Sequence, residues 1–372
     1  MSSTGTEEVT KQETAEAPTT AQASRRSWVP HLQRGEWIRA AIIVGLLLFV
    51  LFALPARLSG YWINVSTDTA IYSIVALGLG VLMGRTGLVS LGQIAILALA
   101  GWVAARLFFV TDLPFPLVLL GAGLITMVLG TVIGLPALRL QGLYLALITL
   151  MLAGAITVVI RTTNFPNGGG GFLGHTETDR GAADVRRPAI AHADTAFFRY
   201  TVIVAAVMFL IALIHVRAKP GRAWAAIRQS EPSALAGGVN ITLYKLWAFA
   251  LASFLTGVAG GLLAARSGQL FTLQFPTQDS ILLLAAVLMG GIYSLWGAIV
   301  AGALMRLLPA LLDNWGLPAD LLTILFGVGV LQVLLTAPQG IVYQFPRDMA
   351  KLGKLIYGLF GRAKTPARER AG

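Results

Sequence analysis

Long apolar stretches recur along this 372-residue chain, and charged residues fall almost entirely between them. A transmembrane helix needs about 20 mostly apolar residues, or fewer where neighbouring protein covers its ends. By that criterion ten segments are candidate spans: 38–55, 69–84, 88–110, 114–136, 143–160, 198–216, 246–265, 280–292, 298–312 and 320–337. Segments 69–84, 280–292 and 298–312 are short, as re-entrant helices are. The sequence predicts an all-α polytopic membrane protein with 8–10 transmembrane helices, some short or re-entrant.

Charged residues make up 12% of the chain, about half the share of an average soluble domain. The chain has no cysteine, which excludes disulfides and thiolate metal sites. The net charge of +11 would suggest nucleic-acid binding in a soluble protein. In an apolar chain it instead indicates cationic loops on the inner membrane face, so we expect a lipid bilayer and no nucleic acid as surroundings.

The distribution of Lys and Arg predicts the orientation of the spans. With the N-terminus inside, 18 cations fall in predicted inner segments and 7 in outer ones, which places both termini in the cytoplasm. Five regions follow: a disordered cytoplasmic N-terminal tail (1–37), a transmembrane domain (38–338) with an outer loop (161–197) and an inner loop (217–245), and a basic cytoplasmic C-terminal tail (339–372).

No catalytic motif appears: the chain has no H-E-x-x-H pair, no G-x-S-x-G elbow and no G-x-x-x-x-G-K-[ST] phosphate loop. We therefore expect no catalytic or metal site, and any ATP energy has to come from a partner. The carboxylates near the spans are predicted at loops or helix ends: Asp68, Asp112, Asp279, Asp313 and Asp320. A proton-coupled carrier usually holds such a group inside a span, so their placement disfavours that class.

The inner loop contains an apolar stripe at helical spacing, formed by Ala223, Ile227, Ala234 and Leu235. Pro232 predicts a break into two short helices, with Ser230 and Glu231 at the junction. Two interpretations remain open. The helix pair either docks into another protein or anchors to anionic lipid.

The same loop resembles the cytoplasmic signature of permease subunits in the branched-chain amino acid ABC uptake family (LivM type). The matching positions are Gly221-Arg222-Ala223, Ala226-Ile227-Arg228, Glu231, Ala234, Gly238, Asn240 and Tyr244-Lys245-Leu246. Pro232 and Val239 depart from the family pattern. Three further stretches agree in order, at 77–93, 138–150 and 290–298, with departures at Gly80, Tyr293 and Ala298. Ala155 stands where the family often has an acidic residue, so the resemblance does not extend to the identity of the substrate.

The resemblance implies an ABC importer permease in the inner membrane of a prokaryote, for branched-chain amino acids or a related small polar solute. It implies a second related permease subunit, two ATPases that bind ATP and magnesium, and an extracytoplasmic solute-binding protein; the chain itself binds no cofactor. By the resemblance, the residues that couple to the ATPases are Gly221, Arg222, Ala226, Arg228, Glu231, Ala234, Gly238 and Asn240.

Two further sets of residues are predicted from their place in the apolar segments. Polar groups that could contact substrate, or else bond within their own helices, are Ser90, Gln93, Tyr144, Thr149 and Ser294. Glycines expected to allow close helix packing or unwinding are Gly84, Gly87, Gly92, Gly290, Gly291 and Gly297. We expect Arg106 and Arg306 to snorkel or to pair with polar groups. The alternatives to an importer subunit are a stand-alone secondary carrier or channel and a membrane-bound lipid enzyme.

Overall fold

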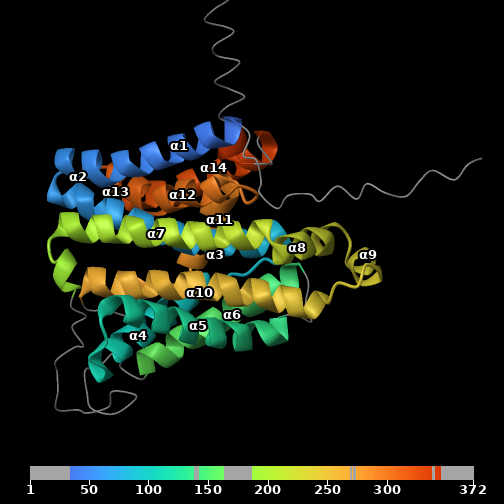
Figure 1. Cartoon of the computed structure of the whole chain (residues 1–372). Helices are drawn as coiled ribbons and strands as arrows, with labels where there is room; N and C mark the ends of the chain where they lie inside the picture. The colour runs from blue at the N-terminus through green and yellow to red at the C-terminus, as the bar shows by residue number, and fades with distance from the viewer. Residues whose placement is uncertain are drawn as a thin grey trace, which may run out of the picture. The chain divides into compact units, whose positions relative to one another are not determined.

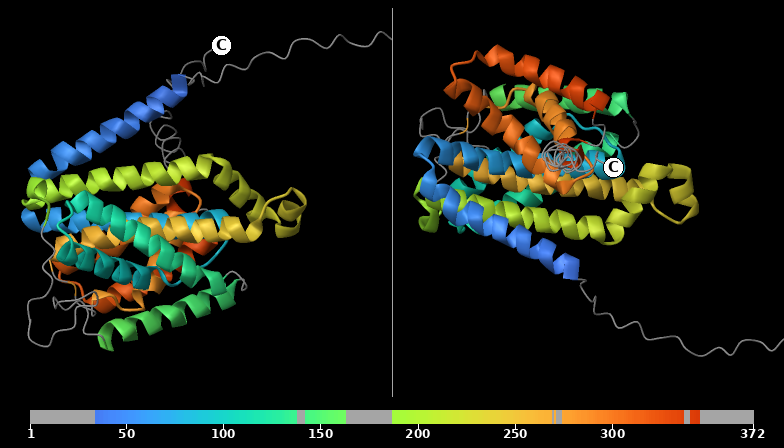
Figure 2. Two further views of the ribbon diagram at one scale, coloured as in Figure 1. Left: turned by 60° about the horizontal axis from the view of Figure 1, so that its bottom comes forward. Right: turned by 90° about the horizontal axis from the view of Figure 1, so that it is seen from above.

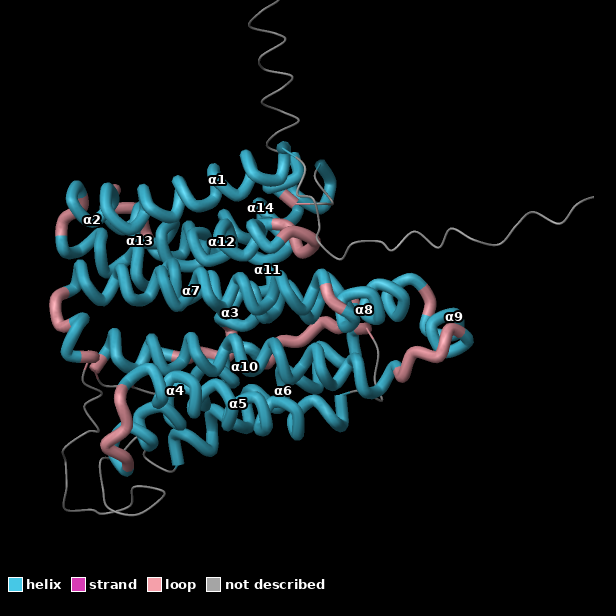
Figure 3. The backbone as a smooth tube through the Cα atoms, viewed as in Figure 1, coloured by secondary structure: helices cyan, strands magenta, loops and turns pink. Residues whose placement is uncertain are grey.

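The computed structural model describes residues 34–137, 142–162, 187–268, 270, 274–336 and 340–344, and all regular structure in these ranges is helical (Figure 3). The chain divides into two compact units, residues 1–50 and 51–372. In the first unit the structure describes one α-helix, α1 (Arg34–Leu48). The π-helical turn η1 (Phe49–Ala53) follows at the boundary. Most of the predicted tails and of the outer loop lie outside the described residues.

The second unit is a bundle of helices of unequal length (Figure 1). Its elements are α2 (Leu54–Arg57), α3 (Gly60–Thr86), α4 (Gln93–Val110), α5 (Phe115–Ala137), α6 (Leu143–Thr162), η2 (Ala189–Ala191), α7 (Asp194–Arg217), α8 (Lys219–Gln229), α9 (Glu231–Ala236), α10 (Ile241–Ser267), α11 (Asp279–Gly290), α12 (Leu295–Gly302), the π-helical turn η4 (Ala303–Leu307), α13 (Leu308–Asn314) and α14 (Ala319–Thr336).

The predicted membrane spans correspond to these helices. Six helical segments are long and apolar enough to cross a bilayer, and four shorter apolar helices accompany them among the described residues. This confirms an all-α polytopic membrane protein. The predicted short span 69–84 is in fact the 27-residue helix α3, whereas 280–292 stays short as the 12-residue helix α11. The span predicted at 298–312 is α12 and α13 joined by the wide turn η4.

Helix α10 is the most enclosed of the candidate spans, with 94% of its apolar window buried. It packs against α3, α4 and α5 (Figures 1 and 2). Small residues make this possible. A side chain at Gly260 would collide with Ala100 and with the backbone of Leu97 and Gly101, so α4 and α10 approach almost backbone to backbone.

Apolar side chains also cover much of the outer surface, as expected for helices that face lipid or another membrane subunit. Representative exposed residues are Val128 and Val132 on α5, Met151 and Val158 on α6, Leu210 and Ile214 on α7, and Leu331 and Leu335 on α14. Helices α8 and α9 lack such a surface and project beyond the ends of α7 and α10 (Figures 1 and 2).

Candidate coupling site and substrate pathway

The loop between α7 and α10 folds as the two short helices α8 and α9, as the sequence predicts. Each begins with Pro in its first turn, where a missing N–H costs no hydrogen bond. Ser230 lies between them in extended conformation and caps α9, because its hydroxyl accepts the backbone N–H of Ser233 at 3.4 Å. The break therefore falls one residue before Glu231, at the junction predicted from Pro232.

Helix α8 buries one face against the bundle through Gly221, Ala223, Trp224 and Ile227. The position of a Cβ at Gly221 is occupied by the backbone carbonyl of Val216, so α7 and α8 meet too closely for any other residue. Ala234 of α9 is buried as well. Leu235, predicted on the same apolar stripe, is instead 60% exposed, because α9 turns this side chain away from α8.

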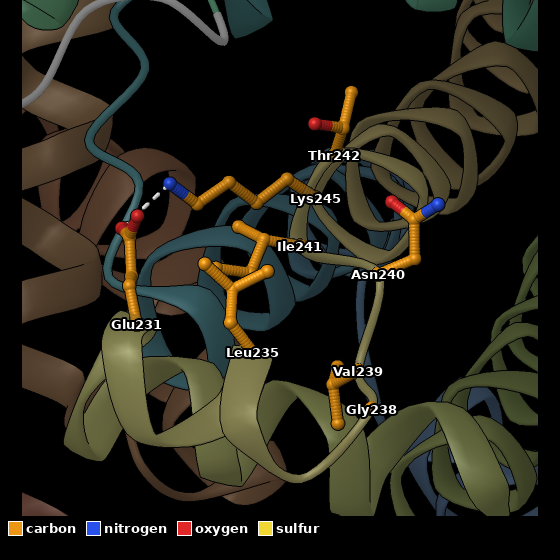
Figure 4. Close-up of a pocket in the computed structure, with 8 residues that line it drawn as sticks. All are labelled: Glu231, Leu235, Gly238, Val239, Asn240, Ile241, Thr242 and Lys245. Atoms are coloured by element: carbon orange, nitrogen blue, oxygen red, sulfur yellow. Dashed lines mark hydrogen bonds and ion pairs between the residues drawn. The ribbon is translucent and has the colours of Figure 1, made fainter.

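Two polar contacts join the helix pair to the first turns of α10. The indole N–H of fully buried Trp224 donates to the carbonyl oxygen of Tyr244 at 2.8 Å. The ammonium Nζ of Lys245 lies 2.7 Å from Oε1 of Glu231 (Figure 4). Lys245 is only 4% exposed, so this ion pair is partly screened from water. Both halves of the loop are thus fixed to α10.

Arg228 joins α8 to two other parts of the bundle. Its Nη1 donates to the carbonyl oxygen of Gly84 near the end of α3. Its Nη2 donates to the hydroxyl of Tyr293 at 2.5 Å, and the guanidinium lies 4.3 Å from the centre of the Tyr293 ring. Arg85 adds a hydrogen bond to the carbonyl oxygen of Tyr293 at 3.2 Å. Tyr293, a departure from the family pattern, is therefore the residue in the turn between α11 and α12 that receives α8.

The opposite side of the helix pair is exposed and hollowed. Arg222, Gly238 and Asn240 are exposed, and Ala226 is half-buried. An open hollow of about 630 Å³ lies between α9 and the start of α10, lined by Glu231, Leu235, Gly238, Val239, Asn240, Ile241, Thr242 and Lys245 (Figure 4). Asn240 also has a local task, because its side-chain oxygen accepts the N–H of Leu243 at 3.1 Å and so caps α10.

Gly238 is needed for the path of the backbone. It has φ +76°, and the N–H of Val239 bonds to the carbonyl of Ala234 at 3.0 Å, which is the hydrogen bond that ends a helix in a Schellman motif. The exposed edge of the helix pair thus ends in a left-handed turn that L-residues with bulky side chains adopt only at a cost.

The six predicted glycines fall into three groups. Gly84, Gly290 and Gly297 mark close approach, because a Cβ at each would meet backbone atoms of the turn between α11 and α12 or of its flanking residues. Gly87 and Gly291 have positive φ and follow the ends of α3 and α11. Gly92, just before α4, has only ordinary contacts with Thr149 and Ser90.

The structure brings three of the five predicted pathway residues together at the start of α4. Ser90 and Gln93 flank the non-helical segment between α3 and α4, and both are buried. The hydroxyl of buried Thr149, on α6, accepts the N–H of Leu91 at 2.9 Å. Gln93 accepts a hydrogen bond from Thr256 at 2.9 Å, and Thr256 lies near the middle of α10, so α4 begins deep inside the bundle.

The other two pathway residues lie elsewhere. Tyr144 is 72% exposed on α6, and Ser294 precedes α12, in the turn that also holds Tyr293. The hydroxyl of Thr149 also donates within its own helix, to Leu145 or Ala146 at 3.0 Å, as the simpler interpretation of such residues expects. Non-helical backbone at this depth is tolerated where protein covers it, and here Leu88, Ser90 and Leu91 are buried.

One prediction about the carboxylates is wrong. Asp68 was expected outside the spans, but α3 begins at Gly60 and holds Asp68 in its third turn. Its Oδ1 lies 3.6 Å from Nε of Arg266, on α10. Asp279 does start α11, as predicted. Arg306 pairs with a polar group, as expected, since it donates to the hydroxyl of Tyr72. Spacing alone gave no signal for this cluster, because its members lie far apart in the chain.

No group of three or more His, Cys, Asp or Glu suited to a metal ion occurs in the part of the chain that the structure describes. The chemistry of the described polar clusters is therefore that of hydrogen bonds and ion pairs between helices.

Comparison with known proteins agrees with these features. Residues 61–334 match the protein family described as branched-chain amino acid transport system / permease component. Two curated relatives are the high-affinity branched-chain amino acid transport system permease proteins LivM of Salmonella typhimurium (strain LT2) and of Escherichia coli (strain K12). Each is 28% identical over 326 residues, which cover 83% of this chain and 76% of the relative. No solved structure matches the chain.

Proposed function

Because this chain belongs to the branched-chain amino acid transport permease family, we propose that it is the membrane-spanning subunit of an ATP-driven importer for a branched-chain amino acid or a related small polar solute. The subunit itself catalyses no reaction and binds no cofactor. It provides half of the passage, and a second related permease subunit provides the other half. Two ATPases that bind ATP and magnesium drive it, and an extracytoplasmic binding protein delivers the solute.

The proposed setting is the inner membrane of a prokaryote, with both termini in the cytoplasm. The excess of Lys and Arg in the predicted inner segments supports this orientation. In this orientation α8 and α9 face the cytoplasm, where ATPases would dock. The projection of these helices beyond α7 and α10 leaves their outer side free for such a contact.

The observation that carries the proposal is the way the helix pair is tied to the spans. Trp224 and Glu231 join it to α10, and Arg228 joins it to α3 and to the turn before α12. An ATPase that moves the helix pair therefore moves several spans at once. Alternating access needs two arrangements of the spans within a few kcal/mol of each other, and only a linkage of this kind lets ATP hydrolysis bias one of them.

The proposed route for the solute passes the start of α4. Helices that begin in the interior present unpaired backbone N–H groups, and transporters commonly use such interrupted helices at their substrate sites. Ser90, Gln93 and Thr149 lie together at this point, so we assign them to the pathway. Tyr144 and Ser294 do not share this location.

The test is reconstitution of the permease with its partners in liposomes. We expect uptake that depends on ATP and on the binding protein, with no uptake by the permease alone. Uptake by the purified chain without ATPases would overturn the proposal in favour of a stand-alone carrier. Identifying the solute then requires a thermal-shift screen of the binding protein, since Ala155 leaves the substrate open on the side of the permease.

A further inference from the structure

A cluster of charged residues lies between α3, α10, α11 and the wide turn η4, apart from both the helix pair and the start of α4. It consists of Asp68, Arg266, Asp279, Arg306 and the phenol of Tyr72. Charged side chains within membrane spans are costly and are retained mainly where they bind or move something. Neither the coupling contacts nor the proposed pathway uses this cluster.

The cluster is incompletely bonded. Asp68 and Arg266 are 3.6 Å apart, which is an ion pair but too long for a hydrogen bond. The Nε atoms of Arg266 and Arg306 are both enclosed and have no hydrogen-bond partner. The guanidinium of Arg306 is held from one side, where it lies 3.8 Å from the centre of the Tyr72 ring and donates to its hydroxyl. Two buried guanidinium donors therefore lack an acceptor.

The charges of the cluster select the kind of acceptor. Asp68 and Asp279 both act electrostatically on Arg306, so two carboxylates and two guanidinium groups balance within one region. A ligand with a carboxylate alone would be repelled by both Asp side chains, and one with an ammonium alone by both Arg side chains. A ligand that carries both charges on adjacent atoms meets neither penalty.

The position of the cluster suits an arriving solute. Arg266 lies in the last turn of α10, whereas Lys245, which pairs with the helix pair, lies near its first turn. The cluster is thus at the opposite end of α10 from α8 and α9. In the proposed orientation this is the extracytoplasmic side.

We propose that Arg266 and Arg306 bind the carboxylate, and Asp68 and Asp279 the ammonium, of an α-amino acid zwitterion as it enters the permease. This site rests on the proposed function and deepens it. It lies before the start of α4 on the route, and it makes the permease itself selective for zwitterions, independently of the binding protein.

The experiment measures binding of radiolabelled leucine to the assembled permease–ATPase complex in nanodiscs, without the binding protein. The competitors are 3-methylbutylamine, which lacks the carboxylate, and 4-methylpentanoate, which lacks the ammonium. We expect leucine to compete far better than either analogue. Arg306→Gln should weaken leucine binding by about 10- to 100-fold, the range for loss of a hydrogen bond to a charged group. Arg187→Gln, which breaks the separate 2.6 Å pair with Asp194, is the matched control and should leave binding unchanged.

Asp68→Asn separates a binding role from a structural one. It should weaken leucine binding yet improve competition by 4-methylpentanoate, because one of the two repelling carboxylates is gone. A generally damaged fold would weaken both. If Arg306→Gln fails to assemble, Asp68→Asn and the analogue series in the wild-type complex decide the matter.

Three results would overturn the site: no leucine binding to the wild-type complex, equal competition by leucine and 4-methylpentanoate, or leucine binding within twofold of wild type in both Arg306→Gln and Asp68→Asn. ATP-driven uptake by the wild-type importer is measured separately. If that uptake persists while the site fails, the proposed function stands; if the uptake is absent, the proposed function fails.

Discussion

The guanidinium of Arg228 stacks over the ring of Tyr293, 4.3 Å from its centre, while its Nη2 donates to the phenol oxygen at 2.5 Å. One arginine thus uses both the face and the hydroxyl of one tyrosine. The contact joins the first helix after α7 to the turn between α11 and α12, 65 residues further along the chain. Four predictions follow from the contacts of this region.

The first concerns the Arg228–Tyr293 contact. Tyr293→Phe keeps the ring and removes the hydroxyl, and Arg228→Lys removes the planar group that stacks on it. We expect both variants to insert normally and to hydrolyse ATP with their partners, but to import several-fold less solute per ATP. The measurement is the ratio of uptake to hydrolysis in proteoliposomes. Tyr144→Phe, an exposed phenol on α6, is the matched control; a wild-type ratio in both Arg228→Lys and Tyr293→Phe would contradict the assignment.

The second prediction concerns the Glu231–Lys245 pair. Glu231→Gln leaves the nearly buried ammonium of Lys245 opposite a neutral amide, and losing a hydrogen bond between charged groups costs about 1.5–3 kcal/mol before solvent screening at the half-exposed Glu231 reduces it. We expect α9 to detach from α10 and coupling to fall. The double variant Glu231→Gln with Lys245→Met should recover part of the loss in thermal stability. Equal melting temperatures for wild type and Glu231→Gln would count against the pair as a structural link.

The third prediction uses the positive φ of Gly238. Gly238→Trp places a bulky L-residue in the left-handed region at a cost of about 1–2 kcal/mol and fills the exposed side of the hollow. Uptake should be lost while membrane insertion is retained. Gly238→Asn is the control, since Asn tolerates this conformation and should preserve uptake. If Gly238→Trp transports at the wild-type rate with its ATPases, the helix pair does not dock there.

The fourth prediction is about stability alone. Gly221→Ala forces a methyl group into the carbonyl of Val216, and overpacking of this kind typically costs about 1–3 kcal/mol. Gly154→Ala is the matched control on α6, because nothing lies within 4 Å of its Cβ position and Ala is favoured over Gly in a helix by up to about 1 kcal/mol. Thermal unfolding in detergent should show a lower midpoint for the first variant and no decrease for the second. A fall of similar size in both would refute this prediction.

Local signals made the helix pair predictable. Pro220, Ser230 and Pro232 determine where α8 and α9 start, and each acts within a few residues of itself. The apolar segments were equally visible, because membrane helices need long runs without charge. The direction of a single side chain was harder. Leu235 and Tyr144 fit their patterns but are exposed, since the tilt of a short or peripheral helix is set by its neighbours.

Long-range pairing escaped prediction. Asp68 looked like the end of a loop because a charge normally interrupts a span, yet α3 continues through it with Arg266 as its partner from a helix almost 200 residues away. The contact between Arg228 and Tyr293 has the same character, as neither residue implies the other. Charges inside the bundle therefore have to be assigned from the folded protein.

The wide turn η4 has a consequence for the segment it interrupts. A π-turn holds one residue more than an α-turn, so every side chain after Ala303–Leu307 is rotated by about 100° from where an unbroken helix would carry it. Gly297 and Ala301 before the turn therefore face one set of neighbours, and Ala310 and Leu312 after it face another. This segment has two reading frames along a single axis, and deleting one residue at the turn would erase the difference between them.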